Sequence, residues 1–311
     1  MNMLEIQNCT ICYQNGTPAV SDVSLSVSEG EIVSIVGESG SGKTTVIRSI
    51  LGLLPSGGKV TKGDILFEGE SLLQYSKKQW RELRGTQISM IFQDSGAMMN
   101  PTKKIGTVFT EYIRTQEKIA KKEAWEKGIT MLERMRLPAA DNVMNSYPFQ
   151  LSGGMARRVL ISAAVLETPK LIVADEPTPG LSVDMAMDTL KHFRKIANTG
   201  TGILLITHDI DLAFEVADRI AVFYAGTVVE ISPTEDFKKG KEYLRHPYSK
   251  AFLRALPQNE FQPIPGIQPY AGNLPEGCLF ANRCPDVSEK CTGQIPMREL
   301  RGGKVRCVNA T

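Results

Sequence analysis

The chain has no large excess of charge of either sign. Its 311 residues include 36 Lys and Arg and 34 Asp and Glu, which gives a formal net charge of +2. Nucleic-acid-binding domains usually carry a strong basic excess, so we expect no nucleic-acid partner. The hydrophobic fraction of 42% and the charged fraction of 23% are those of an ordinary globular protein and exclude wholesale disorder.

Long hydrophobic runs are absent as well. The longest unbroken run, Ile220–Ala225, has six residues, whereas a membrane-spanning helix needs about 20. The first residues lack a basic segment followed by an apolar one, so we expect no secretory signal. These absences predict a protein that stays in the cytosol and reaches a membrane only through a partner. We also find no internal repeat, so the chain is expected to carry one catalytic unit.

Apolar segments of strand length alternate with segments that have a helical pattern. Strands made almost wholly of apolar residues are typical of a parallel sheet that helices cover on both faces. Residues 105–145 are rich in helical patterns, with charges of both signs on a solvated face. The core strands are expected at 32–36, 171–175 and 203–207, and the helices that follow them at about 43–54, 184–198 and 211–217.

The strongest motif is the glycine-rich loop Gly37-Glu38-Ser39-Gly40-Ser41-Gly42-Lys43-Thr44. It fits the pattern G-x-x-x-x-G-K-[ST] and lies between an expected strand and an expected helix, which is the context that this pattern requires. Glycines let backbone N–H groups wrap phosphates, and a helix N-terminus adds partial positive charge. We expect Lys43 to reach the β- and γ-phosphates and the Thr44 hydroxyl to bind Mg²⁺. Thr45 is a further expected nucleotide contact.

A second motif consists of two adjacent carboxylates, Asp175 and Glu176, at the end of an apolar strand. Asp175 is expected to hold Mg²⁺ through its water shell. Glu176 is expected to polarise the attacking water as a general base. Taken alone, the pattern also fits a strand that ends in an acidic turn, so this interpretation depends on the glycine-rich loop.

The third motif, Leu151-Ser152-Gly153-Gly154-Met155, precedes a helical run. Ser152 is expected to cap that helix, and the two glycines expose backbone N–H groups at its start, which makes a second anion site. An ordinary capped helix would have the same local pattern. In a single α/β unit this motif cannot reach the nucleotide on the first loop, so we expect it to serve a nucleotide held by another subunit.

Together these motifs resemble those of the ATP-binding subunits of ABC transporters. The resemblance covers about residues 3–256 and implies a nucleotide-binding domain at 1–256. That domain would be an α/β P-loop ATPase with a mostly parallel core sheet, an antiparallel β subdomain and a helical subdomain at about 94–165. In the family's order, the motifs are Walker A at 37–44, Gln93 in Ile91–Asp94, the signature at 151–155, Walker B at 171–176 and His208 in Ile206–Asp209.

The resemblance also implies roles at the matching positions. Gln93 would contact Mg²⁺ and the attacking water near the membrane subunit, and His208 would contact the γ-phosphate. Tyr13 would stack on adenine, although a tyrosine in a strand is also common without such a role. The implied cofactors are ATP and Mg²⁺, with Thr44, Gln93 and Asp175 around the ion.

Residues after 224 narrow the resemblance to importers of oligopeptides, dipeptides and nickel. In that branch an Arg-His-Pro-Tyr-Ser/Thr segment, here Arg245–Ser249, precedes a cysteine-containing tail similar to Gly277–Pro285. Such ATPases usually work as a pair of different chains with two transmembrane permeases and an extracytoplasmic substrate-binding protein. The resemblance therefore implies a second ABC ATPase subunit as a partner and a peripheral position at the cytoplasmic face of the cell membrane.

Two places depart from the pattern of this family. Ser182 stands where the family usually has an aspartate that helps to couple the two nucleotide sites of a dimer. Met155-Ala156-Arg157-Arg158 replaces the Met-Arg-Gln-Arg that is usual in the branch. We hypothesise that these departures make the two ATP sites of a heterodimer unequal.

Cysteines gather at the end of the chain, where four of the six lie in the last 34 residues. They follow a Pro- and Gly-rich arm at 257–277, so 257–311 is expected to form a C-terminal extension. Four thiolates can bind zinc or a [4Fe–4S] cluster, and the spacing alone chooses neither. Tails of the resembled branch carry [4Fe–4S], which favours a cluster, with zinc and free thiols as alternatives. The four residues are Cys278, Cys284, Cys291 and Cys307, whereas Cys9 and Cys12 are expected to be ordinary strand thiols.

We therefore expect an ATP-hydrolysing subunit of an ABC importer for peptides, nickel or metal chelates, in which closure of a dimer on ATP is passed to the permeases. One alternative is a catalytically weak, ATP-binding regulatory or iron–sulfur subunit, which the Ser182 departure favours and the intact Lys43 and Glu176 disfavour. The other is a soluble, non-transport ABC ATPase. Such chains usually carry two ATPase units or a long coiled-coil insertion, and this chain has neither.

Overall fold

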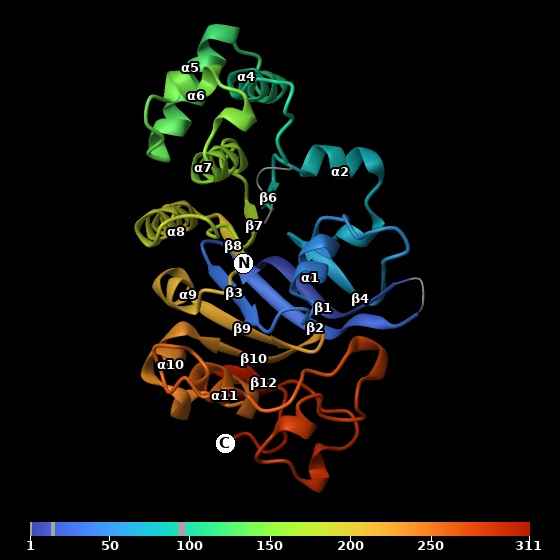
Figure 1. Cartoon of the computed structure of the whole chain (residues 1–311). Helices are drawn as coiled ribbons and strands as arrows, with labels where there is room; N and C mark the ends of the chain where they lie inside the picture. Colours follow the sequence, from blue (N-terminus) through green and yellow to red (C-terminus); the bar gives the residue numbers. More distant parts are fainter. Residues whose placement is uncertain (1, 14–15, 93–97) are drawn as a thin grey trace.

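The computed structural model describes residues 2–13, 16–92 and 98–311 of the chain (Figure 1). Within them, eight strands form one sheet and four strands form another. The larger sheet crosses the middle of the molecule, a lobe of helices lies at one end, and the C-terminal tail lies at the other (Figure 1). No helix in these residues is long and apolar enough to cross a bilayer.

The larger sheet forms the centre of the fold. Its strands are β3 (Ile32–Gly37), β6 (Ile88–Ile91), β7 (Leu171–Asp175), β8 (Gly202–Ile206), β9 (Arg219–Tyr224), β10 (Thr227–Pro233), β11 (Arg298–Leu300) and β12 (Gly303–Val305). Their order is β11-β12-β10-β9-β3-β8-β7-β6, and the five strands from β9 to β6 are parallel. The predicted core strands β3, β7 and β8 are buried at every position, because their sequences are almost wholly apolar and both faces are covered.

The smaller sheet is antiparallel and packs against the larger one. Its strands are β1 (Asn2–Cys12), β2 (Pro18–Ser28), β4 (Lys59–Phe67) and β5 (Glu70–Ser71), in the order β2-β1-β4-β5. A core of apolar side chains from β1, β2, β3 and the helix α1 (Lys43–Ile50) fills the space between the sheets. This packing fixes the start of α1 at the carboxyl end of β3. Cys9 and Cys12 lie in β1 with buried, unbridged side chains.

The other face of the larger sheet is covered by helices. Side chains from α8 (Val183–Ala197), α9 (Ile210–Val216) and α11 (Pro247–Arg254) share one apolar core with β3, β7 and β8. The short helix α10 (Thr234–Lys239) adds Phe237 to the same core, whereas α2 (Lys77–Leu83) places Leu83 in the core between the two sheets. The parallel sheet is therefore covered on both faces, as the apolar strands predict.

The helix after the glycine-rich loop is shorter than the sequence predicts. The pattern predicts a helix to about residue 54, whereas α1 ends at Ile50. Gly52 has a φ of +60°, and the N–H of Leu53 donates to the carbonyl oxygen of Arg48 at 2.8 Å, which closes the last turn. A Cβ at Gly52 would lie 2.7 Å from the Trp80 ring. A glycine cap therefore stops the helix although the apolar pattern continues.

The helical lobe has a core of its own. It contains α4 (Ile105–Gln116), α5 (Lys121–Arg134), α6 (Ala140–Asn145) and α7 (Gly153–Ala164). Buried side chains such as Phe109, Leu132 and Val159 hold these helices together. The lobe lies beside β6 and β7, on the side of the sheet away from the tail (Figure 1).

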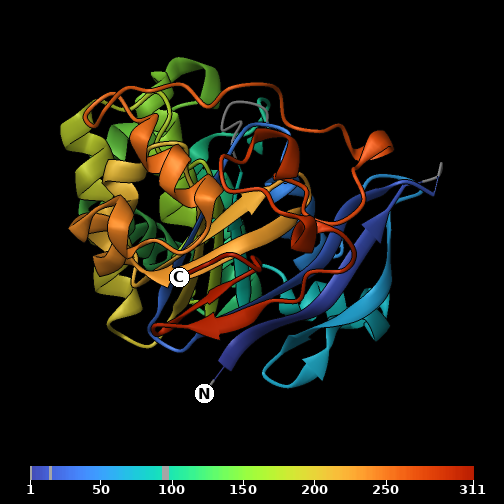
Figure 2. The same ribbon diagram turned by 90° about the horizontal axis from the view of Figure 1, so that it is seen from below.

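The tail crosses back to the main sheet. From 257 to 277 it has no α-helix or strand, in keeping with the predicted extended arm, and contains one 3-10 turn at Ala271–Asn273. At its end, β12 pairs with β10 through Glu230 and Val305, so the tail extends the larger sheet (Figure 2). The sequence does not predict this pairing, because β11 and β12 have only three residues each and show no strand pattern.

Candidate functional site

The glycine-rich loop joins the end of β3 to the start of α1. Gly37 has a φ of +144°, and a Cβ there would lie 2.2 Å from the carbonyl oxygen of Phe223 in β9. Gly42 has a φ of +100°, and a Cβ there would lie 3.1 Å from the carbonyl oxygen of Ala19. Other residues would be strained at both positions. The two glycines therefore let the loop turn tightly and open the N-terminus of α1 to an anion.

Lys43 lies inside this loop and is buried. Its Nζ donates to the carbonyl oxygens of Gly37 and Glu38, each at 2.8 Å. Burial lowers the pKa of Lys43, while the carboxylates of Glu176 and Asp175 act in the opposite direction. The ammonium group therefore lies between the loop and the carboxylates that follow β7.

Asp175 is the last residue of β7 and is buried. Burial raises the pKa of its carboxyl group, and a hydrogen bond from the Thr44 side chain opposes that rise. Among the described residues, Asp175 Oδ1 has no hydrogen-bond partner. A buried carboxylate oxygen without a partner, beside a threonine hydroxyl, is a donor set that suits a hard divalent cation such as Mg²⁺.

Glu176 and His208 form a close pair. Nε2 of His208, which follows β8, lies 2.6 Å from Oε1 of Glu176. Glu176 has a φ of +48°, an unfavourable conformation for a residue with a side chain. Its backbone is held on both sides, because its N–H donates to Ile206 at 3.0 Å and its carbonyl oxygen accepts from Arg157 Nη1 at 2.8 Å. The structure thus fixes this carboxylate next to Asp175 despite a cost in backbone strain.

The remaining predicted residues lie in three places. Tyr13 lies near the start of α1, with its hydroxyl 3.4 Å from Oγ1 of Thr45. Ser152 caps α7 in the helical lobe, where its Oγ accepts from the N–H of Met155 at 3.3 Å, and Gly153 has open space around its Cα. Figure 1 shows α7 and α1 on opposite sides of β6 and β7. Gln93 lies outside the described residues. The structure therefore brings together the described residues that we predict to contact the nucleotide, except Ser152, Gly153 and Gly154 of the signature.

Two arginines that the sequence motifs did not predict contact the site. Arg157, in α7, holds the Glu176 carbonyl as described above. Arg283, in the cysteine-rich tail, places Nη1 2.9 Å from Oε1 of Glu38 in the glycine-rich loop. Arg157 lies in the segment Met155–Arg158 that departs from the usual pattern of the branch, and this departure could have marked Arg157 as a residue of interest. Nothing in the sequence near 283 indicates a contact with a loop 245 residues earlier.

The four tail cysteines form no disulfide; Cys291 and Cys307 are buried, and Cys278 and Cys284 are partly exposed. Burial raises the pKa of Cys284 to about 11, and it also raises the pKa of Cys278 and Cys307. Charge on neighbouring tail cysteines, Cys291 included, raises the pKa of these thiols further. In the part of the chain that the structure describes, no group of three or more His, Cys, Asp or Glu side chains is arranged to hold a metal ion.

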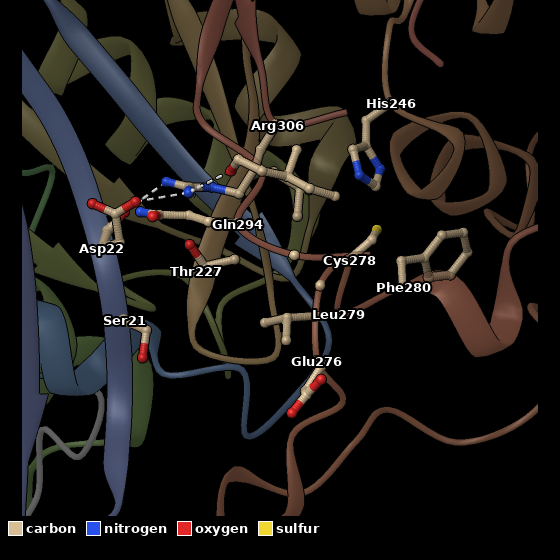
Figure 3. Close-up of a pocket in the computed structure, with 14 residues that line it drawn as sticks. Ser21, Asp22, Thr227, His246, Glu276, Cys278, Leu279, Phe280, Gln294 and Arg306 are labelled. Carbon is tan, nitrogen blue, oxygen red and sulfur yellow. Dashed lines mark hydrogen bonds and ion pairs between the residues drawn. The ribbon is translucent and has the colours of Figure 1, made fainter. Parts of the chain in front are cut away.

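A cavity of about 400 Å³ lies between this tail and strands β2 and β10 (Figure 3). On one side of it Arg306 forms an ion pair with Asp22 at 2.8 Å. On the other, Cys278 lies beside His246, whose Nδ1 accepts from the N–H of Tyr248 at 3.0 Å (Figure 3). Of the described atoms around the cavity, Nε2 of His246 and Oγ1 of Thr227 are buried without a hydrogen-bond partner. The cysteine segment therefore borders a cavity against strands of both sheets.

Comparisons with known proteins agree with this geometry. Residues 20–179 match the family model described as ABC transporter, and residues 229–291 match the one described as oligopeptide/dipeptide transporter, C-terminal region. The probable D,D-dipeptide transport ATP-binding protein DdpD of Escherichia coli is 38% identical over 98% of this chain and 95% of its own length. The oligopeptide transport ATP-binding protein AppD of Bacillus subtilis is 37% identical over 98% of this chain and 96% of its own length.

Solved structures give the same answer for the fold. A dimeric post-hydrolysis state of the ATP-binding cassette MJ0796, bound to ADP and Pi, has a TM-score of 0.68 and 26% identity. The match covers 75% of this chain and 99% of that one. The chain therefore belongs to the ABC transporter family, as a transport ATPase subunit that carries the oligopeptide/dipeptide transporter C-terminal region.

Proposed function

We propose that this chain hydrolyses MgATP at an interface with a second ABC ATPase and thereby drives the import of peptides. The observation that carries the proposal is the close pair of Glu176 and His208 at the carboxyl end of the sheet, beside Asp175 and the glycine-rich loop. Phosphoryl transfer needs this combination of a phosphate cradle, a cation site and an oriented base. The relatives named above are transport proteins, which favours this function over a soluble, non-transport ATPase.

Each residue of the site has a proposed role. The loop Gly37–Thr45 cradles the phosphates, Lys43 binds the β- and γ-phosphates, and Tyr13 stacks on adenine. Thr44 and Asp175 hold Mg²⁺, which neutralises charge on the transferring phosphoryl group when it is bound. The unpartnered Oδ1 of Asp175 supports this assignment.

Glu176 acts as the general base for the attacking water in this proposal. His208, at 2.6 Å from its carboxylate, orients that base and contacts the γ-phosphate. Gln93 is proposed as a further contact to Mg²⁺ and water. Hydrogen bonds hold the backbone N–H and the carbonyl oxygen of Glu176, and His208 contacts its carboxylate. The carboxylate therefore has little freedom to turn away from the reacting water.

A second ATPase is proposed to complete the site. Ser152, Gly153 and Gly154 lie in the helical lobe, away from the glycine-rich loop of the same chain (Figure 1). The N-terminus of α7 is therefore free to bind the nucleotide of a partner. We propose a different chain as that partner, with the Ser182 departure making the two sites unequal.

We propose peptides as the cargo and two permeases with an extracytoplasmic substrate-binding protein as the other components. In this assembly the chain would lie at the cytoplasmic face of the membrane. The names of the relatives mention dipeptides and oligopeptides, which supports peptides as the cargo. Nickel or a metal chelate is the alternative cargo, because the resembled branch also includes nickel importers. The cargo itself contacts other subunits, so this chain contributes only the energy.

We also propose that Cys278, Cys284, Cys291 and Cys307 hold a [4Fe–4S] cluster. The mutual effect of these thiols on their pKa values supports one shared site. The N–H of Ser288 at 3.5 Å and Nδ2 of Asn309 at 3.7 Å point to Sγ of Cys291, and such donors stabilise thiolates. The cluster would tie down the tail.

The test is ATPase activity of the complex in proteoliposomes. The chain is reconstituted with its permeases and second ATPase, and ATP turnover is measured with the substrate-binding protein loaded with a peptide mixture or with Ni²⁺. The proposal predicts stimulation by the peptide-loaded protein. Stimulation by the Ni²⁺-loaded protein but not by the peptide-loaded protein would identify nickel, and not peptides, as the cargo. An ATP turnover rate that neither loaded binding protein changes would contradict import.

A further inference from the structure

The loop between the first two tail cysteines reaches the glycine-rich phosphate loop. Arg283 precedes Cys284 directly, and its Nη1 lies 2.9 Å from Oε1 of Glu38. The Glu38 side chain is 31% exposed, whereas that of Arg283 is 5% exposed. The contact therefore has one firmly seated partner from the tail and one more exposed partner from the phosphate loop.

Several contacts fix the guanidinium group of Arg283. Its Nε donates to the carbonyl oxygen of Pro265 at 2.8 Å, and Nη1 also donates to the hydroxyl of Tyr224 at 3.2 Å. The group lies over the rings of Tyr224 and Phe280, at 5.7 and 5.9 Å from their centroids. An arginine held in this way loses little further freedom when it pairs with a carboxylate.

Phe280 provides a second connection from the same cysteine loop. Its ring packs at 5.3 Å from those of both Tyr224 and Tyr248. The hydroxyl of Tyr248 in turn accepts a hydrogen bond from the backbone N–H of Glu38 at 3.3 Å. The cysteine loop thus contacts both the side chain of Glu38, through Arg283, and its backbone, through the aromatic cluster.

The charge of Glu38 makes this contact matter for nucleotide binding. A carboxylate in a loop that cradles a triphosphate repels the ligand, and a paired arginine offsets that repulsion. Glu38 also belongs to the backbone that binds Lys43, since its carbonyl oxygen accepts from Lys43 Nζ at 2.8 Å. Movement of Glu38 therefore displaces both a negative charge and a ligand of the phosphate-binding lysine.

We propose that Arg283 is a positioning residue for the phosphate loop and that it makes the ATP affinity of this chain depend on the order of the Cys278–Cys284 loop. When the cysteine loop is held in place, Arg283 neutralises Glu38 and fixes its position. When the loop is released, Glu38 becomes an unpaired charge beside the phosphates. The inference rests on the proposed ATP site, but it concerns only how the tail acts on that site.

The test is the binding of MgATP to the purified full-length chain, measured by titration calorimetry at low salt. Arg283→Gln should weaken binding about fivefold, which is a modest pairwise coupling. Arg283→Lys should recover part of that loss because it keeps the charge. Adding Glu38→Gln to Arg283→Gln should restore affinity to that of Glu38→Gln alone, because the unpaired carboxylate is gone. High salt should reduce the difference between Arg283→Gln and the unchanged chain.

Arg301→Gln is the matched control, since Arg301 lies in the same tail but contacts Tyr243 and Leu244, away from the phosphate loop. Equal affinity of Arg283→Gln and Arg301→Gln, or additive effects of the Arg283 and Glu38 changes, would overturn the proposal. The rescue by Glu38→Gln separates this mechanism from misfolding, which a second substitution in the phosphate loop would not repair. If the unchanged chain bound no MgATP, the proposed function itself would fail.

A third variant tests the dependence on the cysteine loop. Cys284→Ala should weaken MgATP binding as Arg283→Gln does, and the two changes together should weaken it no further, because both release the same contact. Fully additive losses would show that the cysteine loop and Arg283 act separately, and that result would contradict the proposed link.

Discussion

At the scale of single residues, the arrangement assigns different tasks to two adjacent carboxylates. Asp175 is buried beside Thr44 with one unpartnered oxygen, whereas Glu176 is turned toward His208 by a left-handed backbone. Glu176 follows the last residue of β7, and its left-handed φ departs from the extended backbone of the strand. The side chain of Glu176 therefore does not continue the alternation of the strand. In the proposed mechanism, Asp175 therefore holds the cation and Glu176 faces the attacking water.

Glu176→Gln should separate binding from hydrolysis. The glutamine keeps the shape of the side chain and leaves Lys43 and the phosphate loop unchanged, so MgATP binding should persist. Loss of the general base should slow turnover about 100-fold or more. Steady-state ATPase rates and calorimetry on the reconstituted complex measure both quantities. Glu215→Gln, at an exposed position of α9, is the control, and a turnover equal to that of this control would contradict the role of Glu176.

His246 gives the folded chain a defined acid sensitivity. Burial lowers its pKa from an ordinary 6.5 to about 3, so it is neutral when the chain is folded. The unfolded chain takes up this proton below pH 6.5, and stability should therefore fall as the pH decreases from 6.5 toward 3. The slope is up to about 1.4 kcal/mol per pH unit for one proton. Asparagine at 246 keeps an acceptor for the Tyr248 N–H but does not titrate.

The measurement is the free energy of unfolding of the unchanged chain and of His246→Asn at several pH values from 7.5 to about 4. The variant should show a shallower decline in stability over the acid part of this range. Parallel curves would show that His246 does not account for the acid sensitivity.

At the scale of elements, the sequence predicts best what is encoded locally. The strand, loop and helix around Gly37–Thr44 are contiguous, and the buried strands β7 and β8 have unmixed apolar patterns. Contacts between distant segments leave no such pattern. The pairing of β12 with β10 and the contact of Arg283 with Glu38 depend on how the tail folds back, and no residue near either partner indicates it.

The attachment of the tail to the sheet depends on a buried arginine. Arg245 is 1% exposed, and it pairs with Asp236 at 2.8 Å and with the fully buried Glu230 at 3.4 Å. Its Nε also donates to the carbonyl oxygen of Leu300 in β11 at 2.6 Å. This one side chain therefore connects β10, α10 and the last hairpin of the tail.

Arg245→Met should leave Glu230 as a buried carboxylate without its guanidinium partner. Breaking a buried pair in this way costs roughly 3–5 kcal/mol of unfolding free energy. Arg254→Met is the matched control, because Arg254 pairs with Glu260 at the surface and its loss should cost about 1 kcal/mol or less. Chemical denaturation of the two variants measures the difference. Equal losses would show that the Arg245 network does not anchor the tail.

At the scale of the whole molecule, the motifs of the chain lie in two separate places. The phosphate loop, the carboxylates and His208 gather at one end of the parallel sheet, while the signature segment Ser152–Gly154 lies in the helical lobe (Figure 1). In the proposed function, a nucleotide on the phosphate loop is therefore contacted by the signature segment of another chain. Motif order in the sequence suffices to predict this division, whereas the identity of the second chain and of the cargo depends on surfaces that belong to other proteins.

The most direct test of the account is to recover the complex from the source cells. The tagged full-length chain is extracted in mild detergent, and the proteins that co-purify with it are identified by mass spectrometry. We expect two transmembrane permeases and a second ABC ATPase to co-purify, together with a substrate-binding protein that binds peptides. Recovery of soluble partners alone would contradict the assignment to transport and leave only the ATPase chemistry in place.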